Sequence, residues 1–433
     1  MSLAANFLGG AKSRLLPASI PFRFFAAAVA FHVVMWACLL ADAGNAVGFR
    51  GGLGPTLAAL HALTLGVLVM TSIGASVQLL PVATRRPLAA VWPIRLVFWI
   101  AAPATAALIG GMYTAQVALL VPAAIAVTAG LLLYCGLLAD NLRRARSVPV
   151  AAAYGWAALA AFVLVIFLGA LLAINNRLGM LAAHDHVALA HLILGGFGFM
   201  GLLALGFSHI LVPMFALSEA PSANFSFLSL GLAVFAIIVA VLGAIIDSSE
   251  ALTIATIFGF AAAAIHVRLM LRTLQNGMRK RLGLSFVLIK TGWLALLATP
   301  LVGLCAIYGW AGSNGPTLFA VTLFGAWLLT FLLGVLQRIL PFLASMHAVR
   351  SAGGAAPLLS DLAASRPLQI HALCHAIAIC SIAVAIAVDN VWLMRVGCLV
   401  GLTGAIAFAF FTGNVIRRIA WTEPALAPAR PTV

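Results

Sequence analysis

Charged side chains are scarce in this chain. Only 8% of its 433 residues are Asp, Glu, Lys or Arg, and nine residues are acidic, whereas 64% are hydrophobic. The mean hydropathy is +1.17. A soluble domain needs far more polar surface than this, so the composition excludes a soluble globular protein and indicates a polytopic membrane protein.

Cysteine motifs are missing as well. The six cysteines lie in or beside apolar runs, and no Cys-x-x-Cys-His sequence occurs, which argues against a disulfide framework and against covalently attached c-type haem. The formal net charge is +15, but the basic residues fall between the apolar runs, where membrane topology accounts for them better than nucleic acid does. We therefore expect the lipid bilayer, and no nucleic acid, among the partners.

Twelve apolar runs are long enough to cross a bilayer as α-helices. We expect the spans at residues 21–42, 55–80, 92–112, 115–138, 151–174, 187–213, 225–246, 251–271, 284–309, 316–341, 369–388 and 393–416. They predict an all-α protein with a single transmembrane domain over residues 1–433. Basic clusters such as Arg85-Arg86 and Arg143-Arg144 follow even-numbered spans, and acidic residues such as Asp42 and Asp247 follow odd-numbered spans. The positive-inside rule then predicts cytoplasmic N and C termini in a bacterial-type inner (plasma) membrane.

Three spans share a pattern that indicates an internal repeat. The second span opens with HALTLGVLVM from His61, and the sixth contains HLILGGFGFM from His191, so that histidine aligns with histidine and Gly66 with Gly196. The second, sixth and tenth spans are expected to close at Pro81, Pro213 and Pro341, each three or four residues after Gln78, His209 or Gln337. The longest expected loop, residues 342–368, follows the tenth. This spacing predicts three four-helix units, at about 21–138, 151–271 and 284–416, of which only two carry the histidine.

Histidines at the outer ends of these spans are candidate ligands, because a neutral imidazole binds iron, copper and zinc and is costly to bury without a partner. One arrangement has His61 and His191 flanking a haem. The other has His61, His184, His186 and His191 holding a copper ion. Glycines below each histidine, at Gly66 and from Gly195 to Gly201, would leave room for a flat macrocycle or for close helix packing.

A second, weaker cluster opens the eleventh span. Offsets of three and four place His371, Cys374 and His375 on one helix face, a spacing that suits a metal ion. The alternative is a pair of interfacial histidines beside a buried thiol. His209 and His347 are expected near this end of the bundle. His32, in the middle of the first span, is expected to make a helix–helix hydrogen bond.

The first span carries a recognisable motif. Its opening, Pro21-Phe22-Arg23-Phe24-Phe25, resembles the PFRPFF-type motif of the NnrS family of haem- and copper-associated membrane proteins. The His61 and His191 spans resemble those of the wider haem–copper oxidase subunit I superfamily. The resemblance implies twelve helices in three quasi-equivalent four-helix arcs, with metal-binding histidines near the outer ends of the second, sixth and tenth helices. It also implies b-type haem, copper or both as cofactors.

Departures from the oxidases narrow the expected activity. The seventh span has no histidine pair, the tenth has no haem histidine, and no Asp or Glu lies inside a span except Asp140 at a helix end. Proton relays through membranes use such carboxylates, so a proton-pumping oxidase is not expected.

Three functional hypotheses follow. The first is a metalloprotein, and by resemblance an oxidoreductase, in nitric-oxide response or respiratory electron transfer, with an electron-transfer protein and a diatomic gas as partners. The second is a twelve-span transporter or channel without a redox cofactor. The third is a metal-free assembly or scaffold protein.

Overall fold

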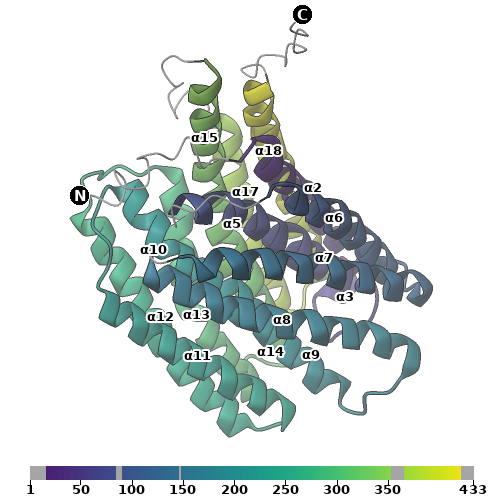
Figure 1. The fold of residues 1–433 in the computed structure, drawn as a ribbon. Helices are drawn as coiled ribbons and strands as arrows, with labels where there is room; N and C mark the ends of the chain where they lie inside the picture. The colour runs from purple at the N-terminus through teal and green to yellow at the C-terminus, as the bar shows by residue number, and fades with distance from the viewer. Residues whose placement is uncertain (1–15, 84–89, 146–147, 353–364, 421–433) are drawn as a thin grey trace, which may run out of the picture.

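The computed structural model describes residues 16–83, 90–145, 148–352 and 365–420. Among these residues there are helices and no β-strand, and twelve helices are long and apolar enough to cross a membrane. The all-α, polytopic class expected from the sequence is therefore confirmed. Figure 1 shows the long helices packed side by side into one bundle, with α15 and α18 projecting together at its top.

The bounds of the spans agree closely with the apolar runs. The first four are α2 (Ser19–Ala41), the continuous helix α4–η2–α5 (Pro55–His61, Ala62–Val69, Met70–Ala83), α6 (Trp92–Tyr113) and α7 (Val117–Arg143), with the short α3 (Ala43–Ala46) between the first two. The next four are α8 (Pro149–Leu178), α9–η3–α10 (His184–Ile193, Leu194–Gly201, Leu202–Ala216), α11 (Ala223–Ile245) and α12 (Ser249–Asn276). The last four are α13 (Leu284–Ile307), α14–η4–α15 (Gly315–Ala320, Val321–Leu329, Thr330–Ala352), α17 (Ser365–Ala387) and α18 (Val391–Ala420).

Three spans contain a π-helical segment, namely the second (η2), the sixth (η3) and the tenth (η4), and within the described chain no other span does. The segments are 8, 8 and 9 residues long, and the fifth residue of each is a glycine: Gly66, Gly198 and Gly325. A π-helix widens the helix and is rare, often marking a functional position. The three spans that share a proline position in the sequence, two of which also share the histidine, thus also share an unusual backbone.

These three helices form the centre of the bundle. The segments η2, η3 and η4 contact one another pairwise. The most apolar windows of their spans are 72%, 56% and 67% buried, against 28–50% for the other nine spans. Glycines allow the close approach, since a Cβ atom at Gly196 would lie 2.8 Å from the Leu323 side chain and one at Gly201 would lie 3.1 Å from Trp327.

The prolines of these spans do not end the helices. Pro81, Pro213 and Pro341 all lie inside helical segments, which continue to Ala83, Ala216 and Ala352. The sixth span ends three residues after Pro213, close to the expected end, whereas the tenth continues past Pro341 to Ala352, so the expected start of a loop at residue 342 is wrong. A membrane helix tolerates proline because neighbouring helices can satisfy the backbone groups that the ring leaves free.

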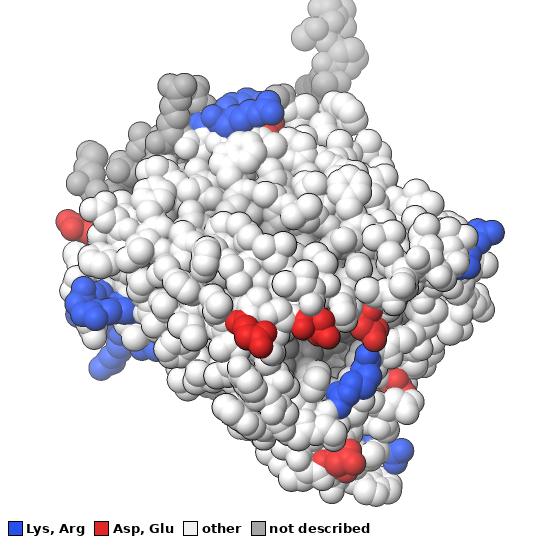
Figure 2. Space-filling view, turned by 90° about the horizontal axis from the view of Figure 1, so that it is seen from below, with Lys and Arg blue, Asp and Glu red and all other residues white. Residues whose placement is uncertain are grey.

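Charged side chains lie mainly at the two ends of the bundle. Asp42, Asp247 and Asp389 directly follow odd-numbered spans, whereas Arg143, Arg279 and the other described basic clusters lie at the opposite ends, which we call the basic end. The basic residues Lys12, Arg14, Arg85, Arg86 and Arg146 lie outside the described residues. In the view of Figure 2, most of the surface is uncharged and the charged side chains form small separate groups, as expected of a surface largely in contact with lipid.

Candidate functional site

The structure brings His61 and His191 together. His61 is the last residue of α4, directly before η2, and His191 lies in α9, three residues before η3. Their ring centroids are 6.5 Å apart and their planes differ by 19°. Both side chains are partly buried. The two residues singled out from the repeat therefore form one pair, which we call the outer histidine pair.

Backbone carbonyls fix the protonation of both rings. The Nδ1 atom of His61 lies 3.0 Å from the Leu57 carbonyl oxygen, and that of His191 lies 3.1 Å from the Val165 carbonyl oxygen. A carbonyl only accepts, so each neutral ring carries its proton on Nδ1 and presents a lone pair on Nε2. No protein group in the described chain hydrogen-bonds to either Nε2 atom. Metal-binding histidines are commonly oriented by such a second-nitrogen bond.

The spacing of the rings fits one metal ion between them. Imidazole nitrogen binds a transition metal at about 2.0–2.1 Å, so two imidazoles on opposite sides of one ion have ring centroids about 6 Å apart. The observed 6.5 Å is close to this value.

The site has less space for a porphyrin than for a single metal ion. The space beside the glycines is taken by neighbouring helices: the Phe31 ring packs on Gly66, Leu323 on Gly196 and Ala161 on Gly198. These glycines serve close helix packing, and a macrocycle does not fit against them in this conformation. Of the two uses that the sequence left open for them, the structure supports packing.

His184 and His186 are not gathered with the outer histidine pair. Asn175 on α8 accepts from the Leu181 backbone N–H, so its amide nitrogen donates to His184 Nδ1 at 2.8 Å and uses that lone pair. His186 Nδ1 lies 3.3 Å from the carbonyl oxygen of Ile245, at the end of α11. Within the described ranges, no group of three or more His, Cys, Asp or Glu side chains is placed to hold a metal ion. The four-histidine copper site is therefore not assembled in this geometry.

The second predicted cluster is arranged differently from the expectation. His371 and His375 are buried in the bundle, whereas Cys374 is half-buried and turned toward α18, where it packs on Gly404. The third member of the cluster is instead His32 of α2, whose ring centroid lies 6.0 Å from that of His371. Sequence reasoning missed this partner, although a histidine in the middle of an apolar span is itself a signal.

A third group of buried polar rings lies between α8, α10 and α12. His209 packs 5.4 Å from Tyr154 and 5.4 Å from His266, measured between ring centroids. His209 is therefore placed away from the His371 cluster, near which it had been expected. His347 packs against Phe22 of α2, with 6.5 Å between centroids.

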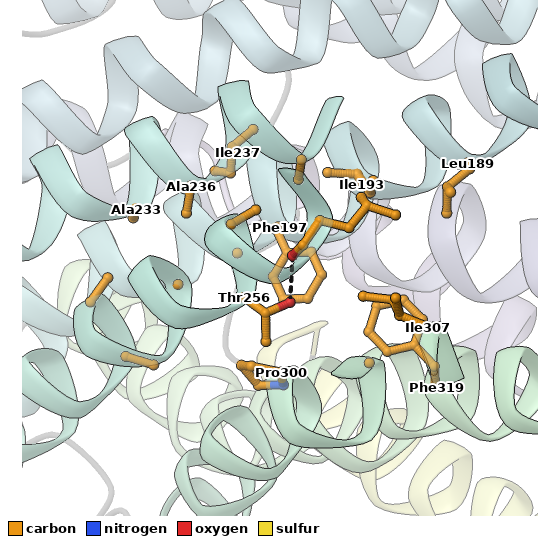
Figure 3. A pocket seen from close by; sticks show the side chains of 18 of the residues that line it. Leu189, Ile193, Phe197, Ala233, Ala236, Ile237, Thr256, Pro300, Ile307 and Phe319 are labelled. Atoms are coloured by element: carbon orange, nitrogen blue, oxygen red, sulfur yellow. Dashed lines mark hydrogen bonds between the residues drawn. The ribbon is translucent and has the colours of Figure 1, made fainter. Parts of the chain in front are cut away.

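A cavity of about 440 Å³ lies on the other side of the sixth span from His191. Leu189 and Ile193, each two residues from His191 and hence on the opposite helix face, line it together with Phe197 (Figure 3). Its walls are mostly apolar, with Asp247, Ser249 and Thr256 as the polar lining residues, and the Thr256 hydroxyl donates to the Leu252 carbonyl at 2.8 Å.

The described residues define a polytopic helical membrane protein with a histidine pair toward the end of its central helices that is opposite the basic end. No protein-family model and no curated protein matches the chain. The assignment of a function therefore depends on the residues themselves.

Proposed function

We propose that this chain is an integral membrane metalloprotein of the NnrS or haem–copper oxidase subunit I type, and that His61 and His191 bind one metal, either haem iron or copper. The observation that carries the proposal is the outer histidine pair. Its two rings come from equivalent helices, and each is held by a backbone carbonyl with the Nε2 lone pair unused.

The arrangement of the helices supports the proposed architecture of three quasi-equivalent four-helix units. The π segments recur every four spans, each has glycine as its fifth residue, and the three contact one another at the centre. Common inverted-repeat transporters divide into two halves instead. We place the basic end, with both termini, in the cytoplasm of a bacterial-type inner membrane because short basic loops are retained there.

The fit of each cofactor follows from the packing. A copper ion needs no space beside the glycines, whereas haem b requires Phe31 and Leu323 to leave the glycines they cover. When bound, the metal supplies electron transfer or the binding of a diatomic gas such as nitric oxide. The carbonyls of Leu57 and Val165 orient the two ligands, and Gly169 lets the His191 ring approach α8.

The apolar cavity is consistent with an uncharged gas as ligand. Most of its wall is apolar, with Asp247 and Ser249 as polar lining residues, and a diatomic gas needs no polar contact. It lies beside the span that carries His191.

The test is a visible spectrum with iron and copper analysis of the purified protein, from cells supplied with both metals. We expect about one metal per chain and, if the metal is haem, a Soret band. A colourless protein that contains neither iron nor copper would contradict the proposal and favour the transporter or scaffold hypothesis.

A further inference from the structure

Three buried histidines form a second polar site, on helices other than those of the outer histidine pair. His32 lies on α2, and His371 and His375 lie one turn apart on α17. Their side chains are 1%, 0% and 3% exposed, so none of them reaches solvent or lipid. The ring centroid of His371 is 6.0 Å from that of His32 and 5.9 Å from that of His375. We call these residues the inner histidine cluster.

Hydrogen bonds fix the tautomer of each ring. The indole N–H of Trp36 donates to His32 Nε2 at 3.1 Å, so the proton of His32 is on Nδ1. His371 Nδ1 lies 3.1 Å from the Gly404 carbonyl oxygen, so its proton is on Nδ1 and its lone pair on Nε2.

His375 is fixed through Thr330. The Thr330 hydroxyl donates to the Gly325 carbonyl at 3.0 Å, so at the 2.7 Å contact with His375 the ring Nε2–H is the donor. Its Nδ1 atom then carries the lone pair.

One nitrogen on each ring is left without a protein partner: Nδ1 of His32, Nε2 of His371 and Nδ1 of His375. From the tautomers above, these are one N–H donor and two acceptors. A water molecule is the complement, because it can accept from His32 and donate to His371 and His375. The His371 ring lies 6.0 Å from the His32 ring and 5.9 Å from the His375 ring, measured between centroids, so the three orphan nitrogens belong to one small group of side chains.

A metal ion suits this cluster less well than it suits the outer histidine pair. Binding through His32 Nδ1 would move the His32 proton to Nε2 and break the bond from Trp36. All three rings would also have to move, since they form no three-ligand group in the described structure. The outer histidine pair presents two nitrogen lone pairs, which a cation needs. The inner histidine cluster presents two lone pairs and one N–H donor.

The cluster lies at a boundary between apolar and polar interior. Toward the outer end, one turn from His32 and His375, Trp36 and Ile379 line an apolar cavity of about 110 Å³. Toward the basic end, Gln337 lies two turns beyond Thr330 on the same helix. Gln337 is 5% exposed and neither its Oε1 nor its Nε2 has a protein partner.

The second and sixth spans also carry a buried polar residue at the corresponding position. Gln78 and His209, which occupy the position of Gln337 in the second and sixth spans, are also buried and also carry side-chain atoms without a protein partner. Buried polar groups that find no protein partner are usually satisfied by internal water. Three positions toward the basic end therefore carry buried polar groups that internal water can satisfy.

We propose that the inner histidine cluster binds one water molecule, the innermost member of a hydrated path that enters from the basic end past Gln337. Such a path brings protons to mid-membrane without any carboxylate. A hydronium ion at this position passes its proton to the lone pair of His371 or His375, which leaves a water molecule and an imidazolium. The proposal does not depend on the proposed metal at His61 and His191.

The direct test is an experimental structure of the full chain at a resolution that shows ordered water. We expect one peak within hydrogen-bonding distance of all three orphan nitrogens, and further peaks between Thr330 and Gln337. Anomalous scattering from a transition metal at this position, or a cluster closed by direct contacts with no peak, would overturn the proposal.

A thermodynamic cycle tests the same idea in solution. His32→Phe and His375→Phe each remove one partner of the shared water, so each should lower the midpoint of thermal unfolding, and the double variant should lose less than the sum. The matched control combines His32→Phe with His266→Phe. His266 lies in another group of buried rings, so the two losses in unfolding midpoint should add. Equal additivity in both pairs would overturn the proposal.

Two further measurements keep the result interpretable. The amide oxygen of His371→Gln can accept the hydrogen bond that Nε2 accepts, whereas His371→Met has no such acceptor. The unfolding midpoint of His371→Gln should therefore lie closer to that of the wild type. If the phenylalanine variants do not fold, this comparison decides, and equal losses would count against a hydrogen-bonded water. Iron and copper contents should be unchanged in all these variants, which separates this proposal from the one for the outer histidine pair.

Discussion

The rings of His61 and His191 lie 6.5 Å apart and within 19° of parallel, although they belong to different four-span segments of the chain. Each is held by a carbonyl: that of Leu57, one turn earlier in α4, and that of Val165, on the neighbouring α8. Two positioned imidazoles with unused lone pairs make a site that can be tested residue by residue.

Replacing either member of the outer histidine pair should remove the metal. His61→Gln or His191→Gln leaves one imidazole, and we expect metal content to fall by at least about tenfold, the size of effect that even an orienting partner of a ligand produces. Iron and copper analysis of purified variants measures this. His184→Gln serves as the control and should retain the metal; a comparable loss in His184→Gln and His186→Gln would instead indicate the four-histidine copper site.

Gly169 should act as a positioning residue for His191. A Cβ atom at Gly169 would lie 3.0 Å from Cε1 of the His191 ring. Gly169→Ala should therefore push the ring and weaken metal binding while leaving the protein folded. The matched control is Gly231→Ala on α11, where no atom lies within 4 Å of the added methyl group. Competition with a calibrated chelator measures the two affinities, and equal values would show that Gly169 has no such role.

Gly66 should be required for packing at the centre of the bundle. A Cβ atom there would overlap the Phe31 ring, so we expect Gly66→Ala to destabilise the protein by about 1–3 kcal/mol, as overpacking does. Thermal unfolding in detergent measures the change. Gly136→Ala on α7, with nothing within 4 Å, should not destabilise, and Phe31→Leu should partly rescue Gly66→Ala. Unfolding temperatures that match in Gly66→Ala and Gly136→Ala would contradict this account.

The proposed orientation predicts which loops face outward. In a variant lacking the six native cysteines, Asp247→Cys should react with a membrane-impermeant thiol reagent in intact cells. Arg279→Cys should react only after the membrane is permeabilised. The opposite labelling pattern would place the basic end outside and would contradict the cytoplasmic termini.

The expected helices agree with the structure because bilayer thickness sets a simple rule. Each run of about twenty apolar residues becomes a helix with its backbone groups paired internally. The spans expected at 92–112 and 284–309 are observed at Trp92–Tyr113 and Leu284–Ile307. The pairing of His61 with His191 was also expected from the repeat, because equivalent helices deliver equivalent residues to the same depth.

The prolines and glycines were less predictable, since their effect depends on neighbours. The helix around Pro341 continues to Ala352, and Gly66 and Gly196 meet Phe31 and Leu323 rather than an open slot. A glycine in the sequence shows that space is available but not which atom takes it. The π segments likewise are not marked by apolar composition, because the α segments of the same spans are apolar as well.

By itself, then, the amino-acid order determined that this is a helical membrane protein with twelve apolar spans, because hydropathy acts locally along the chain. Tertiary structure alone decided which nitrogen atoms have partners. The Val165 carbonyl holds His191, Asn175 uses the lone pair of His184, and His32 joins His371 and His375 across two helices. Each of these depends on residues distant in sequence meeting within a few ångströms, and hydrogen bonds are directional enough that such contacts settle what each imidazole can bind.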